Sequence, residues 1–223
     1  MRDPAATRCR ESVLRGIYLR QFRELTPLRE HIFSLLPLDS IGSIFEPGCG
    51  TGLLGRELQS LTEAEYTGMD IDGSMIPRSG GFIEGDAVAG PLPADLYAAG
   101  FFFSSVGDPQ RWLEKVRECI SPGGLFAVFA EYDYRAVREK PDTGLAGVIR
   151  ESLEMDGLVT SHGGRLDLFF RKAGFSKLHG GNVTGKFQRP DRDFLEMHAP
   201  RFTGEAPLMS WRIVWGIWKN VGW

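Results

Sequence analysis

The segment from Ile44 to Leu58 constrains the fold more than any other part of the chain. A short apolar run ends in Glu46, glycines follow at positions 48, 50 and 52, and the next residues favour a helix. This order predicts a strand, a tight turn and a helix, as at the entry to a nucleotide-binding α/β unit. Glycines in the turn permit positive φ angles and let a ligand lie against the main chain.

The glycine spacing separates two classes of nucleotide site. A dinucleotide-binding turn has the spacing GxGxxG, whose third glycine would fall at the position of Leu53. Here the spacing is GxGxG, and the acidic Glu46 precedes it. A carboxylate at this point would repel a pyrophosphate and suits a cationic or donor-rich ligand. A nucleotide-dependent oxidoreductase is therefore disfavoured, although it remains an alternative.

Beyond this turn, apolar runs and amphipathic segments alternate. We expect strands at residues 43–46, 66–70, 82–83, 95–99 and 125–131, and helices at 53–61 and 110–120. Such alternation predicts a parallel sheet with helices on both faces. Two helices at 8–24 and 28–36 should precede the sheet, and an antiparallel pair at 175–179 and 182–187 should close it.

An insertion follows the fifth expected strand. Residues 132–164 are too many for an ordinary βα loop, and Leu145, Val148, Ile149 and Leu153 suggest a helix within them. Ligands of a doubly wound sheet bind outside the carboxyl ends of its strands. We therefore expect this insertion to form a lid with a partly apolar pocket.

The tail, residues 191–223, is rich in tryptophan. Trp211, Trp215 and Trp218 have the spacing i, i+4, i+7, which predicts a helix with one aromatic face. That face should be buried, either on the domain or in a homodimer, because a large exposed apolar patch is unusual on a monomer.

Composition excludes several classes of protein. The chain has 223 residues, 42% of them hydrophobic and 25% charged, which suits one globular domain. A net charge of −3 disfavours sequence-independent binding to nucleic acid. The three cysteines, Cys9, Cys49 and Cys119, form no CxxC pair, so we expect neither a disulfide framework nor a metal site, and a reducing, cytoplasmic setting. No apolar stretch approaches the ~18 residues of a membrane span, and we expect no membrane partner.

The glycine turn resembles motif I of the class I (Rossmann-like) S-adenosylmethionine-dependent methyltransferases, and later segments are similar to further landmarks of that family in the same order. These segments are Tyr66–Met75 with its acidic strand end, the Gly85-Asp86-Ala87 segment, the Pro122-Gly123-Gly124 turn and the Ala173-Gly174-Phe175 turn. The resemblance implies an α/β fold with a doubly wound, seven-stranded, mostly parallel sheet, an antiparallel last strand, an N-terminal helical cover and the inserted lid.

We expect one domain over residues 1–223. It should comprise N-terminal helices (1–40), a cofactor-binding half (42–131), the lid insertion (132–164), completion of the sheet (165–190) and a C-terminal helical tail (191–223).

The resemblance implies S-adenosylmethionine as cofactor and S-adenosylhomocysteine as its product. It assigns to the cofactor site Glu46, Gly48, Cys49, Gly50, Asp70, Ile71, Met75, Asp86, Ala87 and Gly100. In this assignment Glu46 lies near the methionine amino end, Asp70 accepts hydrogen bonds from the ribose hydroxyls, and Asp86 accepts one from the adenine amino group. Asp70 follows Gly50 by 20 residues, close to the ~20 expected for a ribose-binding acid. Asp72 is a rival for that role, and Asp86 could instead be a turn residue.

Three residues are candidates for contact with the acceptor. Phe101 could place an aromatic face near the cationic sulfonium, Asp133 follows the fifth strand, and His162 could instead merely begin the next helix. The family's nucleic-acid amino methyltransferases have a (D/N)PP(Y/F) segment after the fourth strand, and this chain does not. We therefore expect methyl transfer to a small molecule, with no nucleic-acid partner. The sequence identifies no catalytic residue. A non-catalytic regulatory or assembly protein that binds the same cofactor is the alternative.

Overall fold

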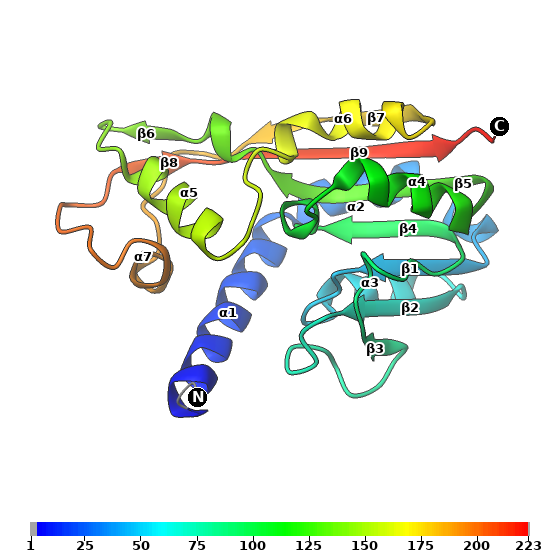
Figure 1. The fold of residues 1–223 in the computed structure, drawn as a ribbon, viewed down its shortest axis with the longest axis horizontal. Helices are drawn as coiled ribbons and strands as arrows, with labels where there is room; N and C mark the ends of the chain where they lie inside the picture. The colour runs from blue at the N-terminus through cyan, green and yellow to red at the C-terminus, as the bar shows by residue number, and fades with distance from the viewer. Residues whose placement is uncertain (1–3, 223) are drawn as a thin grey trace.

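A seven-stranded sheet forms the centre of the molecule (Figure 1). The computed structural model describes residues 4–222, and side chains from residue 12 onward; the ends of the expected domain and the Cys9 side chain lie outside the described residues. The strand order is β3-β2-β1-β4-β5-β9-β7. The strands are β1 (Ser43–Pro47), β2 (Glu65–Asp70), β3 (Phe82–Glu84), β4 (Ala94–Gly100), β5 (Ile120–Tyr132), β7 (Phe175–Thr184) and β9 (Arg212–Asn220).

The pairing confirms the expected fold class. Strands β1 to β5 pair in parallel, whereas β9, the last strand of the chain, is antiparallel to both β5 and β7. The order reverses between β1 and β4, which are neighbours although two strands separate them in the sequence. In open α/β sheets the ligand crevice lies outside the carboxyl ends of the strands at such a switch point.

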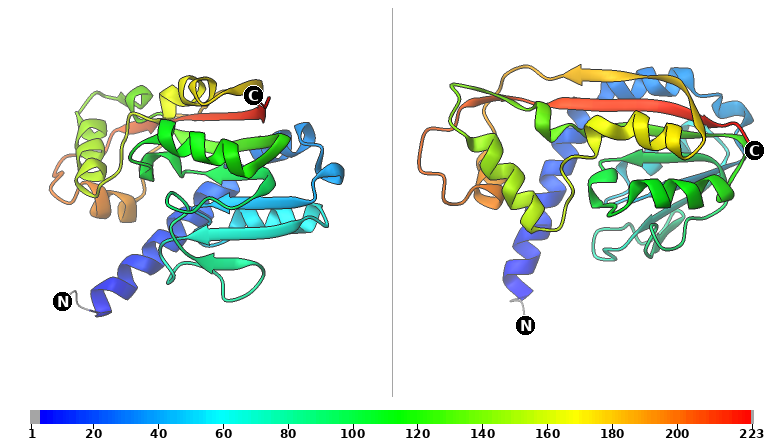
Figure 2. Two further views of the ribbon diagram at one scale, coloured as in Figure 1. Left: turned by 45° about the vertical axis from the view of Figure 1, so that its right-hand side comes forward. Right: turned by 45° about the horizontal axis from the view of Figure 1, so that its top comes forward.

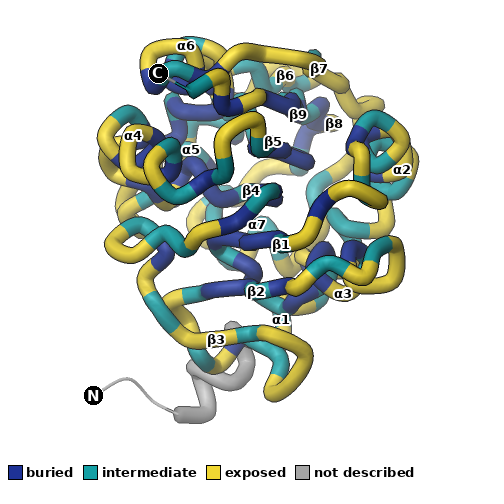
Figure 3. Tube along the Cα trace, turned by 90° about the vertical axis from the view of Figure 1, so that its right-hand side faces the viewer, coloured by how far each residue is buried: buried dark blue, intermediate teal, exposed yellow. Residues whose placement is uncertain are grey.

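Helices cover both faces of the sheet (Figure 3). One face packs against α2 (Thr26–Leu35) and α3 (Leu53–Leu61), with Ile32 and Leu58 fully buried between helix and sheet. The other packs against α4 (Pro109–Cys119) and α6 (Leu166–Lys172), whose Trp112 and Phe170 are similarly enclosed. The two apolar clusters hold the strands in place, so that their carboxyl ends meet at one edge of the molecule.

Helix α1 (Pro4–Glu24) lies outside that edge, as expected for an N-terminal cover (Figures 1 and 2). The Arg15 guanidinium donates to the backbone oxygen of Ser74, at 2.6 Å. Further along the helix, the Gln21 amide donates to the Tyr132 hydroxyl at the end of β5, at 3.0 Å. Helix α1 thus spans from the turn after β2 to the end of β5.

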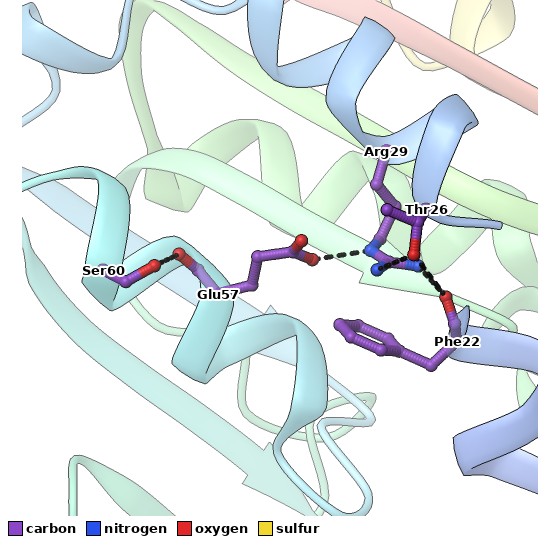
Figure 4. Close-up of polar contacts among 5 residues, drawn as sticks. All are labelled: Phe22, Thr26, Arg29, Glu57 and Ser60. Carbon is purple, nitrogen blue, oxygen red and sulfur yellow. Dashed lines mark hydrogen bonds and ion pairs between the residues drawn. The ribbon is translucent and has the colours of Figure 1, made fainter.

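The junction of α1 and α2 is fixed by a buried arginine (Figure 4). Arg29 donates to the backbone oxygen of Phe22, to the Thr26 hydroxyl and, at 2.6 Å, to the Glu57 carboxylate of α3. Its guanidinium lies 3.4 Å from the centre of the Phe22 ring. Because these contacts join three helices, Arg29 fixes the position of the cover relative to the sheet.

The insertion after β5 does contain a helix, but it combines with a later segment. Short elements η3 (Tyr134–Ala136), β6 (Arg138–Lys140) and α5 (Leu145–Met155) pack with α7 (Arg192–His198) and β8 (Leu208–Ser210) around one apolar cluster. Strands β6 and β8 form a separate two-stranded sheet. We call these two segments, residues 134–158 and 192–211, the cap.

The apolar stripe of α5 does not line a pocket, contrary to expectation. Leu145, Ile149 and Leu153 are buried in the cap's own core, and Val148 is 41% exposed. An isolated helix of 11 residues needs a packing partner, and α7 and β8 supply it.

The predicted C-terminal helix is wrong. Residues 212–220 form β9, which pairs with β5 on one side and β7 on the other. Trp218 is buried and stacks on Phe170 of α6, with ring centres 3.9 Å apart, whereas Trp215 contacts His31 of α2 on the opposite face. A strand sends these two side chains to opposite faces because their spacing is odd. The proposed homodimer through a tryptophan-rich helix therefore loses its structural basis.

The expected antiparallel pair at 175–187 is also wrong. Residues 175–184 form the single strand β7, whose antiparallel partner is β9. Gly180 and Gly181, which suggested a hairpin turn, lie within the strand opposite Gly216 and Trp215.

Within the described residues, no helix is both long and apolar enough to traverse a bilayer.

Candidate active site

The glycine turn joins β1 to α3 in the conformation that its spacing predicts. Gly48, Gly50 and Gly52 have φ angles of 68°, 49° and 70°. The backbone N–H groups of Gly48 and Cys49 both donate to the Met69 oxygen, at 2.8 and 3.1 Å. Left-handed conformations of this kind favour glycine, and the two hydrogen bonds attach the turn to the end of β2.

Asp70 ends β2 directly beside this turn. One carboxylate oxygen accepts the Gly50 N–H at 2.8 Å, and the other accepts the Asp72 N–H at 3.0 Å. Each oxygen retains a further acceptor site. Asp70 is half-buried, whereas the rival Asp72 is exposed and caps its own turn through Ser74. The geometry therefore favours Asp70 over Asp72 as the acid beside the glycine turn.

Glu46 is almost completely buried, although a residue that faces an open crevice would be more exposed. It is 3% exposed, and its carboxyl group accepts the hydroxyl proton of Tyr66. Burial raises the pKa of Glu46 to about 8; the Tyr66 hydrogen bond opposes this shift, and the nearby Asp70 charge adds to it. Gly55 of α3 lies close against both side chains, since a Cβ there would come within 2.9 Å of the Glu46 carboxyl group. Glu46 thus joins β1, β2 and α3, and its contact with a cofactor stays a prediction.

The remaining cofactor candidates surround the same strand ends. Ile71 is 73% exposed directly after Asp70, whereas Met75 is buried. Asp86 accepts the backbone N–H groups of Val88 and Ala89, so it does stabilise its own turn. Ala87 is buried, and its backbone oxygen accepts the Trp112 indole N–H at 3.0 Å.

Gly100 ends β4 at the switch point and has open space beside it. A Cβ at Gly100 would meet no heavy atom within 4 Å. The next residue, Phe101, is the one non-glycine residue with a positive φ, 55°, in the part of the chain that the structure describes. Backbone strain of this kind is concentrated at functional sites.

The three acceptor candidates lie on neighbouring segments, and each has partners of its own. The Phe101 ring lies 4.7 Å from the ring of Tyr132. Asp133 lies against Gly164 and 3.8 Å from the Arg212 guanidinium. His162 is buried, and its Nδ1 lies 3.0 Å from the Phe103 backbone oxygen.

Sequence reasoning missed Glu131. It is 1% exposed near the end of β5, and it accepts the Phe103 N–H at 2.7 Å. Burial raises the pKa of Glu131 to about 7, and hydrogen bonds from Phe103 and its neighbours oppose the shift. A signal was present, because Glu131 ends an apolar run in the same way as Glu46 ends the run before the glycine turn.

These residues fit S-adenosylmethionine. Asp70 has acceptor sites for ribose hydroxyls, the exposed Ile71 offers an apolar surface beside it, and Gly100 leaves room at the end of β4. Two hollows of about 430 and 230 Å³ lie at the opposite end of the sheet, around Leu38 and Pro93, and do not border the glycine turn.

Comparisons with known proteins find a methyltransferase domain in part of the chain. A family model described as a methyltransferase domain matches residues 45–126. A sterol 24-C-methyltransferase of Gibberella zeae is 27% identical over 101 residues, which are 39% of this chain. The chain spans 27% of the length of that relative.

Solved structures show the same fold. An S-adenosylmethionine-dependent methyltransferase from Mesorhizobium loti superposes with a TM-score of 0.56 and 20% identity, over 85% of this chain and 96% of that chain. A chain from the complex that contains the Trm112 methyltransferase activator of Haloferax volcanii gives a TM-score of 0.65 and 15% identity, over the whole of both chains. Residues 45–126 thus match a methyltransferase domain, and the chain has the fold of solved S-adenosylmethionine-dependent methyltransferases.

Proposed function

We propose that this protein transfers the methyl group of S-adenosylmethionine to a small-molecule acceptor. The cap is the observation that most supports the small-molecule part of this proposal. It follows β5 directly, and α1 contacts the end of β5 through Gln21 and Tyr132. An acceptor enclosed between a cover helix and a cap must be small, whereas a polymer needs an open groove.

The cofactor site of the proposal consists of the predicted residues. Asp70 binds the ribose, Asp86 and Ala87 bind adenine, Glu46 lies near the methionine amino end, and the turn from Gly48 to Gly50, with Gly100, gives backbone access. S-adenosylmethionine supplies a methyl group that its sulfonium charge already activates. The protein then has to bind, orient and exclude water, and the cover and cap suit these tasks.

The acceptor side of the proposal is aromatic. Tyr132 contacts Phe101, Tyr134 and Trp211, with ring centres 4.7 to 5.4 Å apart. These rings form a continuous series from the end of β4 to the cap. We therefore expect an acceptor with an apolar or aromatic part.

Partition of a radioactive methyl label tests the proposal. The purified protein is incubated with methyl-labelled S-adenosylmethionine and, separately, with the small-molecule, protein and RNA fractions of a cell extract. We expect label to enter the small-molecule fraction, and Asp70→Ala to reduce it. Label confined to protein or RNA would contradict the small-molecule acceptor. If no fraction is labelled although S-adenosylhomocysteine binds, methyl transfer by the protein alone is refuted.

A further inference from the structure

Two buried side chains from distant segments hold the backbone of Phe103 in the turn after β4, one at its N–H and the other at its oxygen. The N–H of Phe103 donates to Glu131 of β5 at 2.7 Å, and its backbone oxygen lies 3.0 Å from Nδ1 of His162. Glu131 is 1% exposed and His162 is 6% exposed. A carbonyl oxygen only accepts, so His162 Nδ1 has the proton and donates it to this bond.

A third contact fixes the same turn. The backbone N–H of Val159 donates to the oxygen of Ser104 at 2.7 Å. Val159 and His162 belong to the segment that returns from the cap, and η4 (Gly163–Arg165) follows directly. Gly163 packs tightly on the end of β5, because a Cβ there would lie 2.0 Å from the Tyr132 oxygen. The short helix η2 (Phe103–Ser105) is therefore held by β5 and by the return from the cap.

The constrained turn includes the strained residue Phe101. A φ of 55° strains the backbone of an aromatic residue, and it persists only where the surroundings fix it. The Phe101 N–H donates to the Ala130 oxygen at 2.7 Å. Ala130 precedes Glu131, so adjacent residues of β5 hold both ends of the Phe101–Phe103 segment.

This segment lies between the glycine turn and the cap. The Phe102 ring packs on Gly48, where a Cβ would come within 2.4 Å of it. The Phe101 ring contacts Tyr132, which in turn contacts Trp211 of the cap. A shift of the turn would therefore move the wall of the acceptor side relative to the cofactor side.

We propose that Glu131 and His162 are positioning residues, which hold the Phe101–Ser104 turn so that Phe101 forms a fixed wall of the acceptor pocket. This inference rests on the proposed function. It assigns His162 a different role from direct contact with the acceptor, because its Nδ1 is occupied by the Phe103 oxygen. Glu131 in the same way acts through the N–H of Phe103.

Matched substitutions separate the hydrogen bonds from the rest of each side chain. The amide nitrogen in His162→Asn can occupy the position of Nδ1 and donate, whereas His162→Leu has a similar size without a donor. Glu131→Gln supplies an acceptor oxygen for Phe103, and Glu131→Leu does not. Phe101→Gly removes the ring and tolerates the positive φ, so it tests the wall without disturbing the buried contacts.

The five variants are compared with the wild type for S-adenosylhomocysteine affinity, for the kcat and KM of the acceptor found in the labelling experiment, and for amide hydrogen exchange over residues 101–106. We expect His162→Asn and Glu131→Gln to keep kcat within about threefold. The two leucine variants should lose tenfold or more in kcat and exchange faster at residues 101–106, with affinity for S-adenosylhomocysteine within about threefold. Phe101→Gly should raise the acceptor KM about fivefold.

Several results would overturn the inference. Wild-type kcat in a folded leucine variant shows that the turn needs no support. A His162→Asn variant that binds S-adenosylhomocysteine but transfers no methyl group shows that the imidazole itself takes part. If the leucine variants do not fold, an unchanged acceptor KM in Phe101→Gly shows that Phe101 does not form a wall of the acceptor pocket. If the wild type itself transfers no methyl group, the proposed function fails, and exchange at residues 101–106 alone decides whether the two side chains hold the turn.

Discussion

At the scale of single residues, Asp70 is the side chain on which the proposed cofactor site depends most. We expect Asp70→Ala to weaken S-adenosylmethionine binding by ~1.5–3 kcal/mol, as for hydrogen bonds to a charged group, or roughly 10- to 150-fold. Part of this loss comes from the Gly50 N–H, which Asp70 holds at 2.8 Å. Calorimetry measures the effect, and Asp72→Asn, at the exposed neighbour, is the control. Equal affinity of the folded Asp70→Ala protein and the wild type would remove Asp70 from the site.

Glu46 predicts a pH dependence of stability. Its folded-state pKa is about 8, above the ordinary 4.5, because it is buried. Between these values the folded protein binds a proton that the unfolded chain does not, so this contribution to stability falls as the pH rises through the window and is lost above 8. Glu46→Gln removes the titration.

Denaturant unfolding at about pH 5 and about pH 9 measures this contribution. The stability of the wild type relative to Glu46→Gln should fall between them by at least ~1 kcal/mol, since one pKa unit corresponds to about 1.4 kcal/mol. Glu131 titrates in both proteins, and its contribution therefore cancels. Parallel stability profiles would mean that Glu46 is ionised in the folded protein.

The glycine turn and the position of Asp70 could be predicted because they depend on local backbone geometry and on a short spacing. The contacts of Glu131 and His162 could not, because they reach Phe103 from 28 and 59 residues away. A pattern of residue types gives no distance between segments so far apart. Sequence alone could name His162 and Asp133 as polar residues near strand ends, but not the partner of either.

At the scale of helices and strands, Arg29 should be critical for the α1–α2 junction. Arg29→Met keeps an apolar stem but loses every donor to Phe22, Thr26 and Glu57. We expect a loss of about 2–3 kcal/mol in unfolding free energy, below the ~3–5 of a wholly buried pair, because the Glu57 side chain is 26% exposed. Arg192→Met, in an exposed pair with Glu196, is the matched control and should leave the unfolding midpoint unchanged. Equal midpoints for both variants would show that the junction does not depend on Arg29.

Helices and strands could be predicted where the sequence carries one clear periodicity. The prediction was wrong where a helical spacing and a high β-propensity occur in the same segment. Helix α3 and strands β1, β2 and β4 follow from clear apolar periodicity and turn chemistry. In the tail, the tryptophan spacing fits a helix, but Ile213, Val214 and Ile217 favour a strand. The tail forms a strand because β5 and β7 both offer backbone groups with which it pairs. The sequence of the tail alone does not show that these two edges are available.

At the scale of the whole molecule, the last strand completes the sheet. Truncation after Pro207 removes β8 and β9, which lies between β5 and β7. We expect the truncated chain to be insoluble or to lack a cooperative unfolding transition. Truncation after Asn220 removes only the residues beyond β9 and should leave the transition intact. A soluble, cooperatively folded protein that ends at Pro207 would contradict the sheet order.

We expect S-adenosylmethionine to bind across the carboxyl ends of β1, β2 and β4, and both proposals depend on this site. A crystal structure with S-adenosylhomocysteine tests it most directly. We expect the ribose hydroxyls at Asp70, the adenine beside Ile71 and Asp86, and the sulfur near Gly100 and Phe101. Ligand density elsewhere on the molecule would contradict this site. So would the absence of binding at millimolar concentration, which corresponds to a binding free energy weaker than about −4 kcal/mol.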